Sequence, residues 1–399
     1  MDSRKHKIFA IIGTRPDAIK MAPVIKALEE TNELEPIVIA TAQHRQMLDQ
    51  VLSAFELRVH YDLNIMKEGQ DLDYITIESL KGLGRLMDEE KPSMVVVQGD
   101  TTTSFVGGLA AFYRNIPVAH VEAGLRTGDL RQPFPEEANR RLLDAISELL
   151  FPPTEKALKN LLNEGIDPKK CTVTGNTAID ALLWMVSKAH KISDPELEKV
   201  ASDPEKKLIL VTAHRRESFG KPLEEFVDAL KELAEKFDNI NIVYPVHMNP
   251  NVNNVVREKL TGIKGIYLPK PLDYPDFVAL MSKAYLILTD SGGIQEEAPA
   301  LGIPVLVLRQ VTERPEGVEA GAAKVVGMNK KKIIEETEKL LTDPSEYRKM
   351  AKKRFIYGDG KAGKRIVKRI LEFYKDHNKT KLHLTNFYKF HKFVPLFFL

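Results

Sequence analysis

Short apolar runs rich in β-branched residues alternate with longer amphipathic stretches along this chain, and this rhythm limits its possible folds more than any other feature. Apolar runs bounded by Gly, Asp or Pro are typical of strands covered on both faces, and alternating strand and helix patterns predict parallel sheets. The candidate strands are HKIFAIIG, EPIVIAT, SMVVVQGD, IPVAHVEA, CTVTGN, KLILVTAH, NINIVYPV, GIYLPK, YLILTD and IPVLVLR. The predicted fold class is therefore α/β, with doubly wound parallel sheets.

The rhythm breaks once, over about residues 177–206, where a helix-like segment leads into the polar connector SDPELEKVASDPEKK. A chain of 399 residues is also too long for one ordinary domain. We therefore expect two Rossmann-like domains, one over 1–176 and one over 177–358. A helix over about 361–375 is expected to pack back on the first domain, and the tail 376–399 is given no role.

Composition limits the partners of the chain. Lys and Arg (58) nearly balance Asp and Glu (56), which argues against a general nucleic-acid binder. Cys171 is the only cysteine, which excludes an internal disulfide and a cysteine-based zinc site. The first apolar run is too short for a signal peptide, and no stretch approaches the roughly 18 apolar residues of a membrane span. We expect a cytoplasmic protein with no membrane partner.

Polar residues follow several of the candidate strands. Ligands of open α/β sheets bind beyond the carboxyl ends of the strands, so these positions are candidates for a site. They are Gly13-Thr14-Arg15-Pro16, Gln98-Gly99-Asp100, His120-Val121-Glu122-Ala123-Gly124, His214-Arg215-Arg216-Glu217 and Thr289-Asp290-Ser291-Gly292-Gly293. Two domains that present such edges to each other predict a cleft between them.

The segment TDSGGIQEE favours a nucleotide. Glycines at a helix start let backbone N–H groups approach a phosphate, and Glu297, about one turn on, suits two ribose hydroxyls. The alternative is a turn that merely needs glycine. Arg15, held near a helix N-terminus by the proline that follows it, also suits a phosphate, although a surface ion pair is the alternative. Neither G-x-G-x-x-G nor a Walker A motif occurs, so NAD and ATP are not expected.

Three carboxylates indicate proton transfer. Asp100 and Glu122 end successive candidate strands, and Glu136 follows the rigid loop QPFP. Each alone is explained as a helix cap or ion-pair partner, but three acids directed at one cleft favour acid–base chemistry. His214, beside two arginines, is assigned to a phosphate or to proton transfer, with a capping role as the alternative.

A series of motifs follows one order over about residues 7–362: GTRPDAIKMAP, QHRQMLDQ, VQGDTTTSF, HVEAGLRTGD, PFPEEANRRLLD, TAHRRESFG, PVHMNP, TDSGGIQEEAPALGIPVLVLR and TERPE. Together they resemble the non-hydrolysing UDP-N-acetylglucosamine 2-epimerases, and the combination is highly specific although no single motif is. The resemblance implies a glycosyltransferase-B-like fold, in which two Rossmann-like domains face each other across the active-site cleft, and a homodimer.

The resemblance also implies roles for single residues. For the diphosphate these are Arg15, His214, Ser291, Gly292 and Gly293. Glu297 would bind the ribose, Phe277 would pack beside uracil, and Arg314 would reach the phosphate or sugar. The catalytic residues implied are Asp100, Glu122, Glu136, Lys20 and His214. Asp17 stands where the family commonly has Glu; it keeps the charge, so we expect little effect.

Some bacterial members bind a second UDP-N-acetylglucosamine as an activator. The residues that resemble that pocket are Gln43, Gln46, Gln70, Arg215 and His247. Gly69 stands where some activated members carry an arginine, which argues against activation.

The implied reaction interconverts UDP-N-acetylglucosamine and UDP-N-acetylmannosamine by anti elimination of UDP to 2-acetamidoglucal and re-addition, and supplies activated N-acetylmannosamine for cell-surface polysaccharide. It needs neither a cofactor nor a metal. Three alternatives remain: a hydrolysing epimerase that releases N-acetylmannosamine and UDP, a retaining glycosyltransferase of the same fold, and a non-catalytic UDP-sugar sensor.

Overall fold

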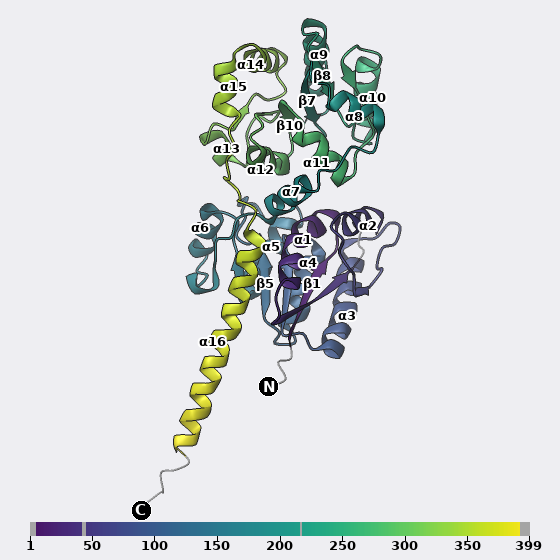
Figure 1. Ribbon diagram of the computed structural model, residues 1–399. Coiled ribbons are helices and arrows are strands. Elements are labelled where there is room, and N and C mark those ends of the chain that lie inside the picture. The colour runs from purple at the N-terminus through teal and green to yellow at the C-terminus, as the bar shows by residue number, and fades with distance from the viewer. Residues whose placement is uncertain (1–4, 42–44, 216–217, 392–399) are drawn as a thin grey trace, which may run out of the picture. The chain divides into compact units, whose positions relative to one another are not determined.

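A computed structural model describes residues 5–41, 45–215 and 218–391 (Figure 1). It divides the chain into two compact units. The first comprises Met1–Leu52, Leu57–Thr177 and Lys361–Leu399, and the second comprises Ser53–Glu56 and Ala178–Gly360. Within the described ranges, no helix is long and apolar enough to cross a membrane.

The first unit is built on a six-stranded parallel sheet, counted over the described residues. Its strands are β1 (His6–Ile12), β2 (Leu34–Ala40), β3 (Tyr61–Asp62), β4 (Met94–Gln98), β5 (Val118–Val121) and β6 (Leu149–Phe151). They lie in the order β3-β2-β1-β4-β5-β6. The order therefore reverses direction between β1 and β4, the point at which open α/β sheets hold their ligands.

Helices cover this sheet, and most of them connect successive parallel strands. They are α1 (Arg15–Glu29), α2 (Arg45–Ala54), α3 (Leu72–Glu90), α4 (Thr102–Phe112), α5 (Glu136–Ile146), α6 (Glu155–Asn163) and the 3₁₀ turn η1 (Pro168–Lys170). The core includes Phe9 and Ile11 of β1 and Val95 and Val97 of β4, all with at most 1% of their surface exposed. Burying each such side chain stabilises the fold by about 1.5–3 kcal/mol.

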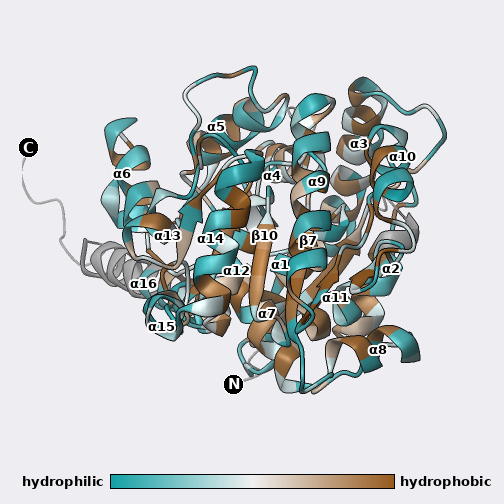
Figure 2. Cartoon of the chain, turned by 90° about the horizontal axis from the view of Figure 1, so that it is seen from above, coloured by the Kyte–Doolittle hydropathy of each residue, from teal (hydrophilic) through white to brown (hydrophobic). Residues whose placement is uncertain are grey.

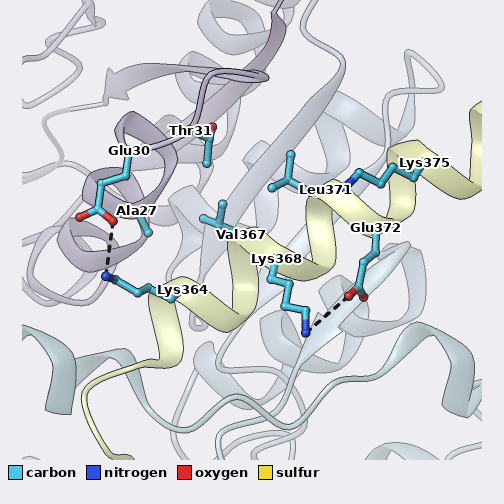
Figure 3. Close-up of a pocket in the computed structure, with 9 residues that line it drawn as sticks. All are labelled: Ala27, Glu30, Thr31, Lys364, Val367, Lys368, Leu371, Glu372 and Lys375. Atoms are coloured by element: carbon cyan, nitrogen blue, oxygen red, sulfur yellow. Dashed lines mark ion pairs between the residues drawn. The ribbon is translucent and has the colours of Figure 1, made fainter.

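The last helix, α16 (Ala362–His391), returns to the first unit and lies along α1. A methyl group at Gly363 would meet the carbonyl oxygen of Pro23 at 2.7 Å, so the two helices approach very closely here. Lys364 pairs with Glu30 at 3.5 Å across the groove that the helices form (Figure 3). None of the residues predicted to bind or react lines this groove.

The second unit repeats the order of the first. Its described strands are β7 (Lys207–Thr212), β8 (Ile240–Val243), β9 (Ile266–Tyr267), β10 (Leu286–Thr289), β11 (Val305–Val307) and β12 (Ala323–Val325). They are parallel and run β12-β11-β10-β7-β8-β9, so the direction reverses between β7 and β10. Figure 2 shows apolar strands such as β10 and polar outer faces on helices such as α9 and α14.

Most helices of the second unit again connect successive strands, whereas the first two precede β7 and the last two follow β12. In chain order, the helices are α7 (Thr177–Ser187), α8 (Pro195–Ala201), α9 (Lys221–Lys236), α10 (Pro250–Leu260), α11 (Tyr274–Ser282), α12 (Gly292–Leu301), α13 (Pro315–Glu319), α14 (Lys330–Thr342) and α15 (Pro344–Met350). The predicted fold class, α/β with two Rossmann-like doubly wound sheets, is confirmed.

One predicted strand is wrong. The segment CTVTGN forms only an isolated bridge between Cys171 and Leu150, although Thr172 N–H donates to the carbonyl of Leu150 at 2.9 Å. The strand on this side of the sheet is β6, formed by the preceding apolar run LLF. A short extended segment beside an edge strand has the composition of a strand, and only the tertiary pairing separates the two.

Candidate functional site

The turn after β1 is fixed by a reciprocal capping box. Thr14 caps α1 with its side chain, and Asp17 Oδ2 accepts from Gly13 N at 3.3 Å and Thr14 N at 3.1 Å. These bonds satisfy amides that a helix start leaves without intrahelical partners. They also set the direction of Arg15, the half-buried first residue of α1.

Asp17 also makes a hydrogen bond across the topological switch point of the sheet, which is the place between β1 and β4 where the strand order reverses. Its Oδ2 accepts a hydrogen bond from Thr101 Oγ1 at 3.1 Å, and Thr101 caps α4 directly after Asp100. Burial raises the pKa of Asp17 to about 6, although its hydrogen bonds act in the opposite direction. One buried carboxylate therefore links the turn that carries Arg15 with the turn that carries Asp100.

Asp100 is held by α5. Its carboxylate pairs with the guanidinium of Arg140, and its carbonyl oxygen accepts from Asn139 Nδ2 at 2.9 Å. Arg140 also contacts Glu137 at 3.2 Å, so the arginine is itself oriented from a second side. Asp100 stays a quarter exposed, which leaves it open to a ligand.

Glu122 lies beside Asp100 because the two residues follow neighbouring strands, with Gly99 N donating to Val121 O at 2.9 Å. Lys20, from α1, places its Nζ 2.8 and 2.6 Å from the two carboxylate oxygens of Glu122. Glu122 has a φ of 68°, a left-handed conformation that residues other than glycine rarely adopt. Such backbone conformations gather at functional sites, where the surrounding structure maintains them.

Glu136 is the first residue of α5. Its Oε2 is buried and has no hydrogen-bond partner within the described part of the chain. Burying a carboxylate oxygen without a donor is costly. Arg140 lies four residues further along α5, so both side chains share the face of the helix from which Arg140 reaches Asp100. The structure thus gathers Lys20, Asp100, Glu122 and α5 with Glu136 around the ends of β4 and β5.

A buried histidine, His120, contacts the turn that carries Asp100. The motifs do not identify this role. His120 Nδ1 lies 2.6 Å from Asp144 Oδ1, and its Nε2 lies 2.8 Å from the carbonyl oxygen of Gly99. Burial would raise the pKa of Asp144, but His120 and Arg126 hold it below its ordinary value. A histidine within the apolar run IPVAHVEA is the one sequence signal that could have identified this pair.

The second unit has a buried carboxylate at its own switch point. Asp290, fully buried directly after β10, accepts from the backbone N–H groups of His214 at 2.7 Å and Arg215 at 2.8 Å. It links the turns after β7 and β10, as Asp17 links those after β1 and β4.

His214 lies in a crowded polar environment. Its ring stacks on that of His247, with 5.4 Å between centroids and 14° between planes. Burial lowers the pKa of His214, and His247 and Arg215 lower it further, whereas Asp290 raises it. The imidazole is therefore mainly neutral at neutral pH.

The start of α12 has the features of an anion site. Ser291 makes no side-chain capping bond in the described structure, so the first N–H groups of the helix are not capped by it. The guanidinium of Arg314 lies over this turn: a methyl group at Gly292 would meet its Nη2 at 3.5 Å. Glu296 holds Arg314 in place through an ion pair. A helix N-terminus beside a guanidinium suits a phosphate.

The remaining candidates are placed as follows. Glu297, half-buried, lies four residues after Gly293 and so shares its face of α12. Phe277 is half-buried on α11. Of the activator residues, Gln70 lies in the first unit, where its Oε1 accepts from Lys67 N at 3.3 Å.

Arg215 and His247 both lie beside His214 in the second unit, so the structure groups these two activator candidates with a predicted active-site residue. Gln43 and the side chain of Gln46 lie outside the described residues.

Two Rossmann-like units with polar groups at both switch points define a two-domain α/β protein with a candidate ligand site in each unit. A family model described as UDP-N-acetylglucosamine 2-epimerase matches residues 26–371. The chain therefore belongs to the UDP-N-acetylglucosamine 2-epimerase family, and the resemblance seen in its motifs is confirmed at the level of this family.

Relatives and solved structures agree with this membership. The UDP-N-acetylglucosamine 2-epimerase of Escherichia coli K12 is 52% identical over 365 residues, which cover 90% of this chain and 97% of the relative. The Bacillus subtilis enzyme of that name is 50% identical over 371 residues, which cover 93% and 96%.

The Neisseria meningitidis enzyme, solved bound to UDP-GlcNAc, has a TM-score of 0.82 and 48% identity, covering 92% of this chain and all of that one. MurG of Acinetobacter baumannii shares the fold, with a TM-score of 0.58 and 16% identity. The superposition covers 92% of this chain and 100% of the MurG chain.

Proposed function

We propose that this chain is a non-hydrolysing UDP-N-acetylglucosamine 2-epimerase, which interconverts UDP-N-acetylglucosamine and UDP-N-acetylmannosamine. The observation that carries the proposal is the grouping of Asp100, Glu122 and Lys20 at the ends of β4 and β5, next to the helix that carries Glu136. A hydrolysing epimerase remains an outcome of the test below.

The chemistry explains why several acids are needed. The hydrogen on C2 lies beside no carbonyl, so simple deprotonation would be far too slow. In the gluco isomer this hydrogen is anti to UDP on C1, and loss of both gives 2-acetamidoglucal and UDP. Re-addition with the proton on the opposite face gives the manno isomer. Asp100, Glu122 and Glu136 come from three different segments, which suits an acid or base on each face of C2.

The departing UDP needs fixed positive charge and N–H donors. The start of α12 with Arg314 offers both, and we assign Ser291, Gly292 and Gly293 to the diphosphate. Arg15 and His214 complete the phosphate contacts in this proposal. Glu297 would accept the ribose hydroxyls, and Phe277 would pack on uracil. The Neisseria meningitidis relative bound to UDP-GlcNAc supports this choice of ligand.

The product would supply activated N-acetylmannosamine for cell-surface polysaccharide. Assembly as a homodimer belongs to the same proposal, and light scattering on the purified protein tests it.

Proton NMR of the purified protein with UDP-N-acetylglucosamine in D₂O tests the reaction. We expect a growing UDP-N-acetylmannosamine signal, with deuterium incorporated at C2. Free N-acetylmannosamine and UDP would identify a hydrolysing epimerase instead. Tight UDP binding with no conversion would contradict both and favour a transferase or a sensor.

A further inference from the structure

The carboxylate of Asp290 fixes the backbone that carries His214. Asp290 N–H donates to Thr212 O at 3.1 Å, which anchors the residue to β7. Its Oδ2 then accepts two successive amides, His214 N and Arg215 N, at 2.7 and 2.8 Å. Because Asp290 is fully buried, water cannot replace it in these bonds.

The second oxygen of Asp290 faces the histidine ring. Oδ1 is buried and lies 3.4 Å from His214 Nδ1, and it has no conventional hydrogen-bond partner within the described residues. A buried carboxylate oxygen without a donor is costly, so this geometry favours a proton on Nδ1. His247 stacks on the ring and limits its rotation. Nε2 is then the nitrogen that remains for a ligand.

The charges around the ring act in two directions. Burial, His247 and Arg215 lower the pKa of His214, and Asp290 raises it. An approaching diphosphate adds negative charge on the Nε2 side. With a carboxylate on the Nδ1 side as well, the imidazolium is stabilised from both ends, and His214 can donate from Nε2 to the ligand.

We propose that Asp290 is a positioning residue: it holds His214 with Nδ1 directed inward, so that Nε2 faces the diphosphate of the nucleotide sugar. This rests on the proposed function, which places His214 at that diphosphate. The ligand class is an oxyanion, and Asp290 itself does not touch it.

Asp290→Asn separates this role from a purely structural one. The amide oxygen can still accept both backbone N–H groups, but the amide NH₂ now faces Nδ1 and favours a proton on Nε2. We expect ¹⁵N NMR of the ring to show this change of tautomer and a lower pKa for His214. The kcat should fall at least about 10-fold, with a smaller change in KM.

Thr212→Val is the matched control. It removes the 2.6 Å hydrogen bond between the hydroxyls of Thr212 and Thr289, which joins the same two strands but does not reach His214. The ring signals and turnover should then stay as in the wild type. An unchanged tautomer and pKa in Asp290→Asn would overturn the proposal.

Two measurements on the unmodified protein cover the case in which Asp290→Asn fails to fold. The free protein must show neutral His214 with its proton on Nδ1, and the opposite tautomer would refute the proposal. Titration with UDP must shift the Nε2 signal, and an unmoved signal would also refute it. Neither readout needs turnover, so a failed epimerase assay with both signals present would contradict the proposed reaction alone.

Discussion

Lys20 and Glu122 form a close ion pair, with 2.6 Å between Nζ and Oε2, and the backbone of Glu122 is left-handed. Only 10% of the Glu122 side chain and 25% of the Lys20 side chain are exposed, so solvent screens the pair less than it would on the surface. The pairing joins α1 to the turn after β5. A carboxylate on a backbone conformation that residues other than glycine rarely adopt is a strong candidate for chemistry.

Removing any one of the three carboxylates should strongly slow turnover while leaving nucleotide binding intact. We expect Asp100→Asn, Glu122→Gln and Glu136→Gln each to lower kcat by about 100-fold or more, the usual scale for acid–base groups. Calorimetry with UDP should give a nearly unchanged Kd, because the proposed UDP contacts lie on other segments. Near-normal turnover in all three variants would refute the carboxylate assignment.

Substitutions of Arg314 and Glu297 should instead weaken the binding of UDP. Arg314→Ala removes the guanidinium over the start of α12, and Glu297→Ala removes the proposed ribose acceptor. We expect each to raise the Kd for UDP by about 10-fold or more, on the scale of a lost charge-assisted hydrogen bond.

Lys330→Ala is the control for this pair of variants. It removes a cation of the same unit that pairs with Glu232 at the surface, 2.8 Å away. Its Kd for UDP should match the wild type. An unchanged Kd in Arg314→Ala or Glu297→Ala would remove that residue from the site.

The raised pKa of Asp17 predicts that this residue's contribution to the stability of the fold decreases as the pH rises. Its pKa is raised to about 6 in the folded protein, so folding favours the protonated carboxyl. The contribution of protonated Asp17 to the free energy of unfolding is fully present below about pH 4, the pKa of this group in the unfolded chain. It is lost as the pH rises through about 6. Asp17→Asn cannot titrate, and its amide oxygen can keep the three bonds that Oδ2 accepts.

We therefore expect Asp17→Asn to gain about 2 kcal/mol relative to the wild type between pH 4 and pH 7. Urea unfolding of both proteins across this range measures the difference, in which the titration of all other groups cancels. Asp17→Ala, which loses the three bonds, should be less stable than Asp17→Asn throughout. A wild-type-to-Asn difference that does not vary with pH would contradict the raised pKa.

The sequence predicts the fold class because long apolar strands carry a strong signal. β1 and β7, of seven and six residues, each contain a continuous apolar run, over residues 8–12 and 208–211. Three of the four described edge strands, β3, β6 and β12, of two or three residues, do not stand out in the sequence, since so few residues show no period. The fourth, β9, is also only two residues long, but the run GIYLPK predicts it. The wrong strand at CTVTGN has the opposite cause: the segment has the composition of a strand, and only the tertiary pairing shows that it is not one.

Site residues at strand ends were similarly accessible to sequence reasoning, because the rule for open sheets needs only the strands. The residues that hold these site residues in place could not be predicted in this way. Asp17 and Thr101 are 84 residues apart in the chain, and Asp290 and His214 are 76 apart. No local pattern encodes such a pairing, since it depends on which strands become neighbours.

Replacing glycine by alanine at the two switch points should have opposite effects on the stability of the fold. A Cβ at Gly13 would lie 2.5 Å from Thr103 Oγ1 and 2.7 Å from its Cβ, so Gly13→Ala should destabilise the fold by about 1–3 kcal/mol. A Cβ at Gly293 would meet only Ser291 Oγ, at 3.9 Å, so it fits without strain.

Gly293→Ala should therefore keep or raise stability, by up to about 1 kcal/mol, because alanine is the better helix former. If the N–H groups of α12 receive the diphosphate, the added methyl obstructs the ligand, and the Kd for UDP should rise by about 10-fold or more. Thermal unfolding and calorimetry on the same samples separate the two effects. Unchanged UDP affinity in a stable Gly293→Ala protein would show that the phosphate does not approach this turn, and the nucleotide would have to be placed elsewhere in the second unit.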